Sequence, residues 1–110
     1  MRQLVVTESA WERTVGLLGH SGLAPDAGLL ILGCASIHTF FMRFAIDAVF
    51  LDETMRICKV VENLVPWRAA RGRGARHVLE LPAGTAARLG LHSGITTRIE
   101  EPTPEANHDR

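Results

Sequence analysis

Three side chains that can carry a charge and bind a charged or polar group lie in the most apolar part of the sequence. They are those of His38, Arg43 and Asp47. The segment 37–51 around them also holds all four phenylalanines of the chain. Charged side chains are rarely buried unless they are paired or hydrogen-bonded. We therefore expect these three to reach a sheet edge or to satisfy one another across the fold, beside an aromatic wall.

A candidate binding site combines this segment with residues further along the chain. Arg43 or Arg68 can hold a carboxylate or phosphate through two parallel hydrogen bonds, and Trp67 can supply an apolar or stacking floor. The expected ligand is small and anionic or polar, or it is an extended segment of a partner protein. The predicted ligand-binding residues are His38, Thr39, Arg43, Asp47, Trp67, Arg68 and Glu80.

A purely structural interpretation of the same residues stays open. Arg43 and Asp47 can form an ion pair that fixes two strands, with Trp67 filling the core. Glu80 alternates with Leu79 and Leu81, so its side chain would point to solvent or toward Arg68.

An enzymatic interpretation assigns His38 as a base and Asp47 as its orienting acid in a small hydrolase-like reaction. The sequence offers no nucleophile in a recognisable context, because Ser36 lacks a Gly-x-Ser-x-Gly elbow and Cys34 lacks a reactive-cysteine signature. We therefore assign no catalytic residue. The histidines and cysteines lack metal-ligand spacing and no nucleotide-binding fingerprint is present, so we predict no metal and no cofactor.

A third interpretation concerns the arginine-rich segment 68–77, which also contains two glycines. Its arginines could contact phosphate or RNA, most directly across Arg71–Arg76, although stacking surfaces for bases are scarce there. The net charge of the chain is +0, so no overall field attracts nucleic acid or a membrane surface. We expect a solvated, flexible loop and do not expect nucleic acid as a partner.

Length and composition fit one soluble domain. The 110 residues are 46% hydrophobic and 22% charged, which allows one core. We predict a single globular domain over 1–100 and a disordered tail over 101–110. No segment resembles a signal peptide or is long enough to span a bilayer, so a cytoplasmic location is expected, with Cys34 and Cys58 reduced. The oligomeric state cannot be derived from the sequence.

Several short strands must position these residues. Apolar runs and alternation predict strands at 4–7, 28–33, 37–43, 46–51, 56–62, 77–81 and 95–99. The turn at 52–55 should join 46–51 to 56–62 as a hairpin. Ser9 and Glu12 form a capping box for a helix ending near Leu18, and Thr85 can cap a second helix over 86–89. The expected fold is α+β, with a small, mostly antiparallel curled sheet or β-barrel-like core and two short helices.

The aromatic segment and the runs around it resemble one protein family. They are similar to the domain-of-unknown-function family 192 (DUF192), and the resemblance extends from about Thr7 to Ile99. It implies a small conserved domain with no assigned activity. This chain departs from the family pattern at Ala45, where a proline is usual, and at Ile95, where an acid is usual. The runs that carry the resemblance are 16–18, 28–30, 36–44, 46–52, 66–68 and 78–84.

Overall fold

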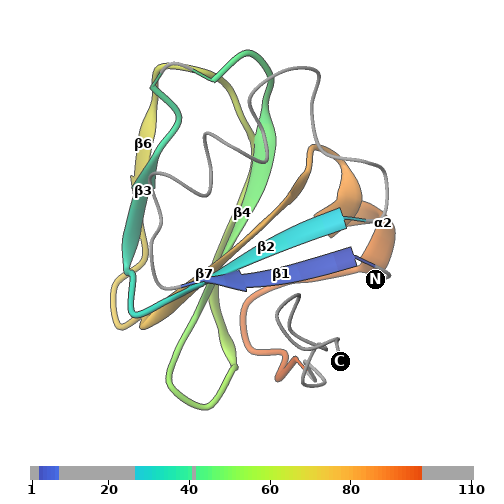
Figure 1. Cartoon of the computed structure of the whole chain (residues 1–110). Helices are drawn as coiled ribbons and strands as arrows, with labels where there is room; N and C mark the ends of the chain where they lie inside the picture. The colour runs from blue at the N-terminus through green and yellow to red at the C-terminus, as the bar shows by residue number, and fades with distance from the viewer. Residues whose placement is uncertain (1–2, 8–26, 41, 98–110) are drawn as a thin grey trace, which may run out of the picture.

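The structure is a computed structural model that describes residues 3–7, 27–40 and 42–97. The described residues form strands and one short helix, α2 (Figure 1). The strands are β1 (Gln3–Thr7), β2 (Ala27–Leu32), β3 (Ser36–His38), β4 (Ile46–Leu51), β5 (Ile57–Leu64), β6 (Ala69–Arg71) and β7 (His77–Pro82), and α2 is Thr85–Leu89. None of the helical structure in these ranges is long and apolar enough to cross a membrane.

Five strands form one open sheet in the order β1-β2-β7-β4-β5. The pairing is antiparallel except between β1 and β2, which run parallel. The hairpin between β4 and β5 confirms the pairing predicted for 46–51 and 56–62. The predicted barrel-like closure is wrong, because β1 and β5 remain as the two ends of the sheet.

The remaining two strands, β3 and β6, pair antiparallel and form a separate two-stranded sheet, here called the ribbon. In Figure 1 the ribbon stands at the left, beside the main sheet. The ribbon packs Ile37 into the core and places Ala70 against it. A second, small sheet thus covers one face of the main sheet, where sequence reasoning expected the main sheet to curl on itself.

The core lies on both faces of the main sheet. Ala48 and Phe50 of β4 face the ribbon, whereas Val49 and Leu51 face the opposite side. Every residue of β4 is therefore buried, as is typical of a strand with both faces covered.

The arginine-rich segment forms structure where a flexible loop was predicted. Residues 69–71 are strand β6, and the amide of Gly72 donates to Ala35 O at 2.9 Å. The amide of Arg76 donates to Leu51 O at 2.7 Å, and Arg76 also lies 3.9 Å from the Glu53 carboxylate in an exposed ion pair. These backbone bonds to distant segments fix the path of 71–76, which local composition alone does not reveal.

The start of α2 differs from its prediction. Gly84, with a left-handed backbone, is the N-cap residue, and Thr85 is the first residue of the helix rather than its cap. A carboxylate from β4 supplies the capping interaction, as described below. The predicted helix ending near Leu18 and the predicted tail over 101–110 lie outside the described residues.

Two predicted strands are shorter in the structure. The segment 37–43 is a strand only as far as His38, and the chain bends at Arg43 and Phe44. In the predicted strand 95–99, Thr96 makes an isolated bridge to Arg56, and residues beyond 97 are not described.

Candidate functional site

The outer face of the ribbon is exposed because its side chains alternate. The pairs Ser36–Arg71 and His38–Ala69 face solvent, and the pair Ile37–Ala70 between them faces the core. This follows from the two-residue period of a strand. The face therefore carries a cation and polar groups over a floor of small apolar residues.

Three stacked rings extend this face beyond the end of β3. The rings of His38 and Phe40 lie 4.6 Å apart at 30°, and those of Phe40 and Trp67 lie 5.7 Å apart at 23°. Phe40 remains 39% exposed and Trp67 55% exposed. Large aromatic side chains contribute most to stability when they are buried. The exposure of Phe40 and Trp67 is therefore unusual for residues of this size.

A buried hydroxyl holds the turn that carries Trp67. The Thr39 hydroxyl donates to Val65 O at 2.7 Å and accepts from the Arg68 amide at 2.9 Å. The Thr39 backbone carbonyl also accepts from the Trp67 amide at 3.0 Å. Thr39 is fully buried, so it is a positioning residue that fixes the aromatic stack from below.

The backbone of this turn is strained. Trp67 has φ 66°, and Asn63, within β5 just before the turn, has φ 55°. Left-handed backbone in a bulky residue costs on the order of 1–3 kcal/mol and persists only where the surroundings impose it. Here the Thr39 bonds impose it, and the result is a tryptophan held partly in solvent.

Asp47 anchors the end of β5 that leads into this turn. Its carboxylate accepts from the Asn63 amide at 2.9 Å and from the Ala86 amide at 2.8 Å. Asp47 is completely buried, and Ala86 lies in the first turn of α2, where a carboxylate satisfies a free N–H and suits the helix dipole. Asp47 therefore joins β4, the end of β5 and the start of α2.

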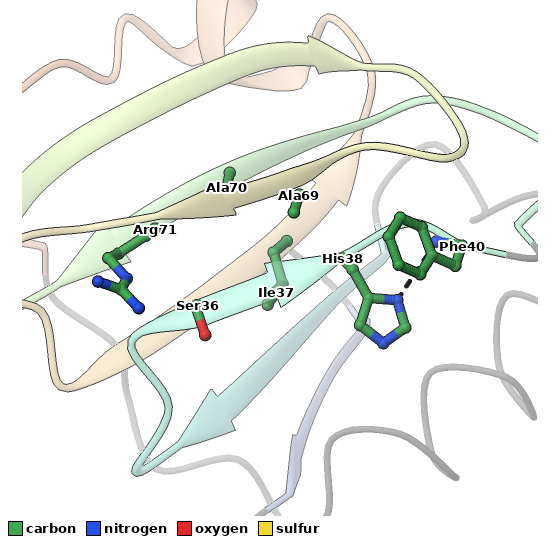
Figure 2. A pocket seen from close by; sticks show the side chains of 7 residues that line it. All are labelled: Ser36, Ile37, His38, Phe40, Ala69, Ala70 and Arg71. Atoms are coloured by element: carbon green, nitrogen blue, oxygen red, sulfur yellow. Dashed lines mark hydrogen bonds between the residues drawn. The ribbon is translucent and has the colours of Figure 1, made fainter.

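A shallow pocket of about 440 Å³ lies on the ribbon (Figure 2). We call it the ribbon pocket. In Figure 2 the side chains of Ser36, His38 and Arg71 point to the same side of the ribbon, with Phe40 beside His38. Near the arginine end, Lys59 Nζ donates to Arg71 O at 3.0 Å, which brings a second cation close. The lining residues are Ser36, Ile37, His38, Phe40, Ala69, Ala70 and Arg71.

The structure divides the seven predicted ligand-binding residues into three groups. His38 and Trp67 lie on the exposed aromatic stack, and Arg68 follows Trp67 on the surface. Thr39 and Asp47 lie beneath, bound to backbone groups. Arg43 is exposed in the bend before β4, and Glu80 is buried in β7.

The ion pair between Arg43 and Asp47 is not formed. Each oxygen of the Asp47 carboxylate already accepts a backbone N–H. The Nδ1 atom of His38 accepts from the Phe40 amide at 3.3 Å. In the hydrolase-like interpretation, the acid would be a carboxylate that already accepts two backbone N–H groups.

Glu80 is the unexpected member of the set. It was expected to point to solvent or toward an arginine, yet it is only 2% exposed. It pairs with Leu29 on one side and Ala48 on the other, because β7 is the middle strand of the sheet. Its Oε1 has no hydrogen-bond partner, and burial raises the pKa of this carboxyl to about 7.

Sequence reasoning did not select several residues of the ribbon pocket. Ser36, Ile37, Phe40, Ala69 and Ala70 line it, and Arg71 was considered only as part of a loop. The alternation that puts His38 and Phe40 on one strand face was a usable signal for Phe40. Nothing local indicated that 69–71 would pair with 36–38.

In the described part of the chain, no three His, Cys, Asp or Glu side chains come together as metal ligands. Cys34 and Cys58 are both free thiols, as predicted.

Comparison with known proteins agrees with the resemblance seen in the sequence. Residues 2–99 match the model of the DUF192 family, which is described as an uncharacterized ACR. A UPF0127 protein of Thermococcus sibiricus is 37% identical over 71 residues, which are 61% of this chain and 45% of that protein. The UPF0127 protein PH1112 of Pyrococcus horikoshii is 45% identical over 51 residues, which are 46% of this chain and 44% of that protein. The matches thus span less than half the length of these curated relatives.

Two crystal structures share the fold. A protein of unknown function from Novosphingobium aromaticivorans superposes with a TM-score of 0.65 at 26% identity, over 83% of this chain and 69% of the other. A proposed transcription regulator from Sinorhizobium meliloti superposes with a TM-score of 0.68 at 31% identity, over 83% of this chain and 74% of the other.

Proposed function

The chain belongs to the DUF192 family, and we propose that it is a non-catalytic module that binds a small anionic ligand on the ribbon. The observation that carries the proposal is the aromatic stack, which the fold keeps exposed at the edge of a pocket containing an arginine. Of the residues predicted from sequence, His38, Trp67 and Arg68 would face the ligand, and Thr39 and Asp47 would position them.

The charge of the pocket favours an anion. Among the described residues that line the pocket, Arg71 is the charged side chain and none carries a carboxylate. Lys59 lies close to Arg71, and Arg68 lies on the next turn. Arginine binds carboxylates and phosphates through paired hydrogen bonds, so this end of the pocket suits either group.

The geometry gives less support to the other interpretations. Catalysis by His38 and Asp47 would need the Asp47 carboxylate, which is bound to two backbone amides. A partner's extended segment would have to add to β3 or β6, and each has only three residues. Recognition by strand addition relies on a row of main-chain hydrogen bonds, which so short an edge cannot supply.

A thermal-shift screen of the purified chain tests the proposal. We expect a ligand with a phosphate or carboxylate group to raise the unfolding midpoint; at about 100 times its dissociation constant it stabilises by about 2.7 kcal/mol. The shift should be lost in Arg71→Ala and retained in Arg88→Ala, which removes a cation from α2 outside the pocket. If no anionic compound shifts the midpoint, or if Arg71→Ala keeps the full shift, the proposal is wrong.

A further inference from the structure

A second arginine lies next to the arginine end of the ribbon pocket. Arg73 follows Arg71 by two residues, so their Cα atoms lie no more than about 7 Å apart. A Cβ at Gly72, between them, would point at the Phe50 side chain in the core. Successive residues of an extended chain point to opposite sides, so both arginines point away from the core, and both are exposed.

The backbone that carries the two arginines is held on both sides. The Gly72 amide donates to Ala35 O at 2.9 Å, and Gly72 O accepts from the Ala75 amide at 3.1 Å. The second bond closes a turn with Arg73 in its second position and Gly74, at φ 80°, in its third, as in a type II turn. The chain therefore loses little conformational freedom here when a ligand binds.

A third cation reaches the same place from the main sheet. Lys59 Nζ donates to Arg71 O at 3.0 Å, and an ammonium group has further N–H donors to offer a ligand. The neighbouring carboxylate of Glu53 is paired with Arg76 at 3.9 Å. Within the described ranges, neither Arg71 nor Arg73 forms an ion pair. Three positive charges thus lie close together and are not neutralised by a described carboxylate.

Two linked phosphates match this group of charges. A phosphate group carries a charge of about −1.5 to −2 near pH 7, so two of them balance three cations, whereas a carboxylate carries a single negative charge. Phosphate oxygens also suit the paired N–H groups of a guanidinium. Ser36, opposite Arg71 in the ribbon, adds a hydroxyl donor beside the first arginine.

We infer that the arginine end of the ribbon pocket binds a pyrophosphate group, either free or at the end of a larger molecule, through Arg71, Arg73 and Lys59. Arg71 and Lys59 bind one phosphate, and Arg73 binds the second beyond the edge of the pocket. This inference rests on the proposed function and names its ligand class.

Calorimetric titrations at constant ionic strength with orthophosphate, pyrophosphate and citrate test the inference. We expect pyrophosphate to bind at least tenfold more tightly than orthophosphate, because only pyrophosphate reaches both arginines. Citrate should also bind at least tenfold more weakly than pyrophosphate, because its negative charge is spread over three separate carboxylates.

Variants separate the two phosphates. Arg73→Gln should remove the preference for pyrophosphate and leave the affinity for orthophosphate within twofold, whereas Arg71→Gln should weaken both ligands at least tenfold. Arg88→Gln is the matched control, since Arg88 is exposed on α2 outside the pocket, and it should change neither affinity. All three arginines are exposed, so the variants should fold, which circular dichroism checks.

Methyl diphosphate distinguishes the two sources of the group, because one end of its pyrophosphate is esterified. An affinity within threefold of that of pyrophosphate assigns the site to the end of a larger molecule, and a loss of more than tenfold assigns it to the free anion. Both results support the inference.

Equal affinities for orthophosphate and pyrophosphate would mean a site for a single anion, and equal affinities for pyrophosphate and citrate would mean selection of charge alone. Either result overturns the inference and leaves the proposed function standing. A preference for pyrophosphate that survives Arg73→Gln overturns it too, since the second phosphate would then lie elsewhere. If no anion binds here or in the thermal-shift screen, the proposed function fails as well.

Discussion

Glu80 carries a charge-bearing group into the middle of the main sheet. Two apolar residues, Leu29 and Ala48, flank it on the neighbouring strands, and its Oε1 has no partner. A buried carboxylate without partners is strongly disfavoured, which is why burial raises the pKa of Glu80 from 4.5 to about 7. The neutral acid is therefore the form that the folded chain prefers below about pH 7.

The raised pKa makes stability depend on pH in a defined direction. Between about pH 4.5 and 7 the unfolded chain has lost this proton while the folded chain keeps it, so the free energy of unfolding falls as pH rises. The total loss is on the order of 3 kcal/mol, from 1.36 kcal/mol per pKa unit. Glu80→Gln cannot lose a proton, so we expect its stability relative to the native chain to increase from pH 4.5 to pH 8.

Urea unfolding at several pH values measures this difference. Glu62→Gln is the matched control, since Glu62 is exposed on β5, and its difference from the native chain should stay nearly constant. A flat difference for Glu80→Gln as well would show that Glu80 gains a partner in solution or titrates near its ordinary pKa.

At the scale of elements, Gly72, the residue that follows β6, lies close against the main sheet. A Cβ placed there would lie 2.6 Å from Cβ and Cγ of Phe50, a buried residue of β4. Position 72 therefore requires glycine, because the chain that follows β6 passes so close to the Phe50 side chain that no space is left for a Cβ. The same contact fixes the position of the pocket relative to the sheet.

We expect Gly72→Ala to destabilise the chain by about 1–3 kcal/mol through overpacking. Phe50→Ala is also expected to destabilise, because it leaves space in the core. The double variant should lose less stability than the sum of the two, because Phe50→Ala removes Cγ and Cδ1, two of the three Phe50 atoms that a Cβ at position 72 would meet. Urea unfolding of the four proteins gives the coupling free energy, and simple additivity would mean that Gly72 and Phe50 do not press on each other.

At the scale of the whole molecule, two strands join the two sides of the core. β4 and β7 contribute Phe50 and Val78 to the side facing the ribbon, and Val49 and Leu79 to the other. Loss of packing on one side disturbs the strands that carry the other. A domain built in this way should unfold as one cooperative unit.

The tryptophans allow a test of this cooperativity. The sequence contains only Trp11 and Trp67, so Trp11→Phe leaves Trp67 as the single fluorescent reporter, on the turn beside the ribbon. We expect its fluorescence and the far-ultraviolet circular dichroism to change at the same urea concentration. An earlier fluorescence transition would show that the ribbon and its turn open separately from the sheet.

The sequence by itself determined the features that depend on neighbours along the chain. Alternation at 57–62 and the turn at 52–55 predicted the β4–β5 hairpin, and the apolar runs predicted the buried strands β2, β4 and β7. The strand and hairpin predictions succeed because side-chain period and turn chemistry are local properties of the backbone. The grouping of His38, Trp67 and Arg68 in one ligand site stays a prediction.

Only the tertiary structure decided which distant segments meet. It paired 36–38 with 69–71, placed β7 between β2 and β4, and left the sheet open. It also bound the Asp47 carboxylate to backbone amides 16 and 39 residues away and buried Glu80. A carboxylate's surroundings follow from long-range packing, so the same residue type can be a ligand, a helix cap or a buried acid, and the linear sequence alone does not distinguish them.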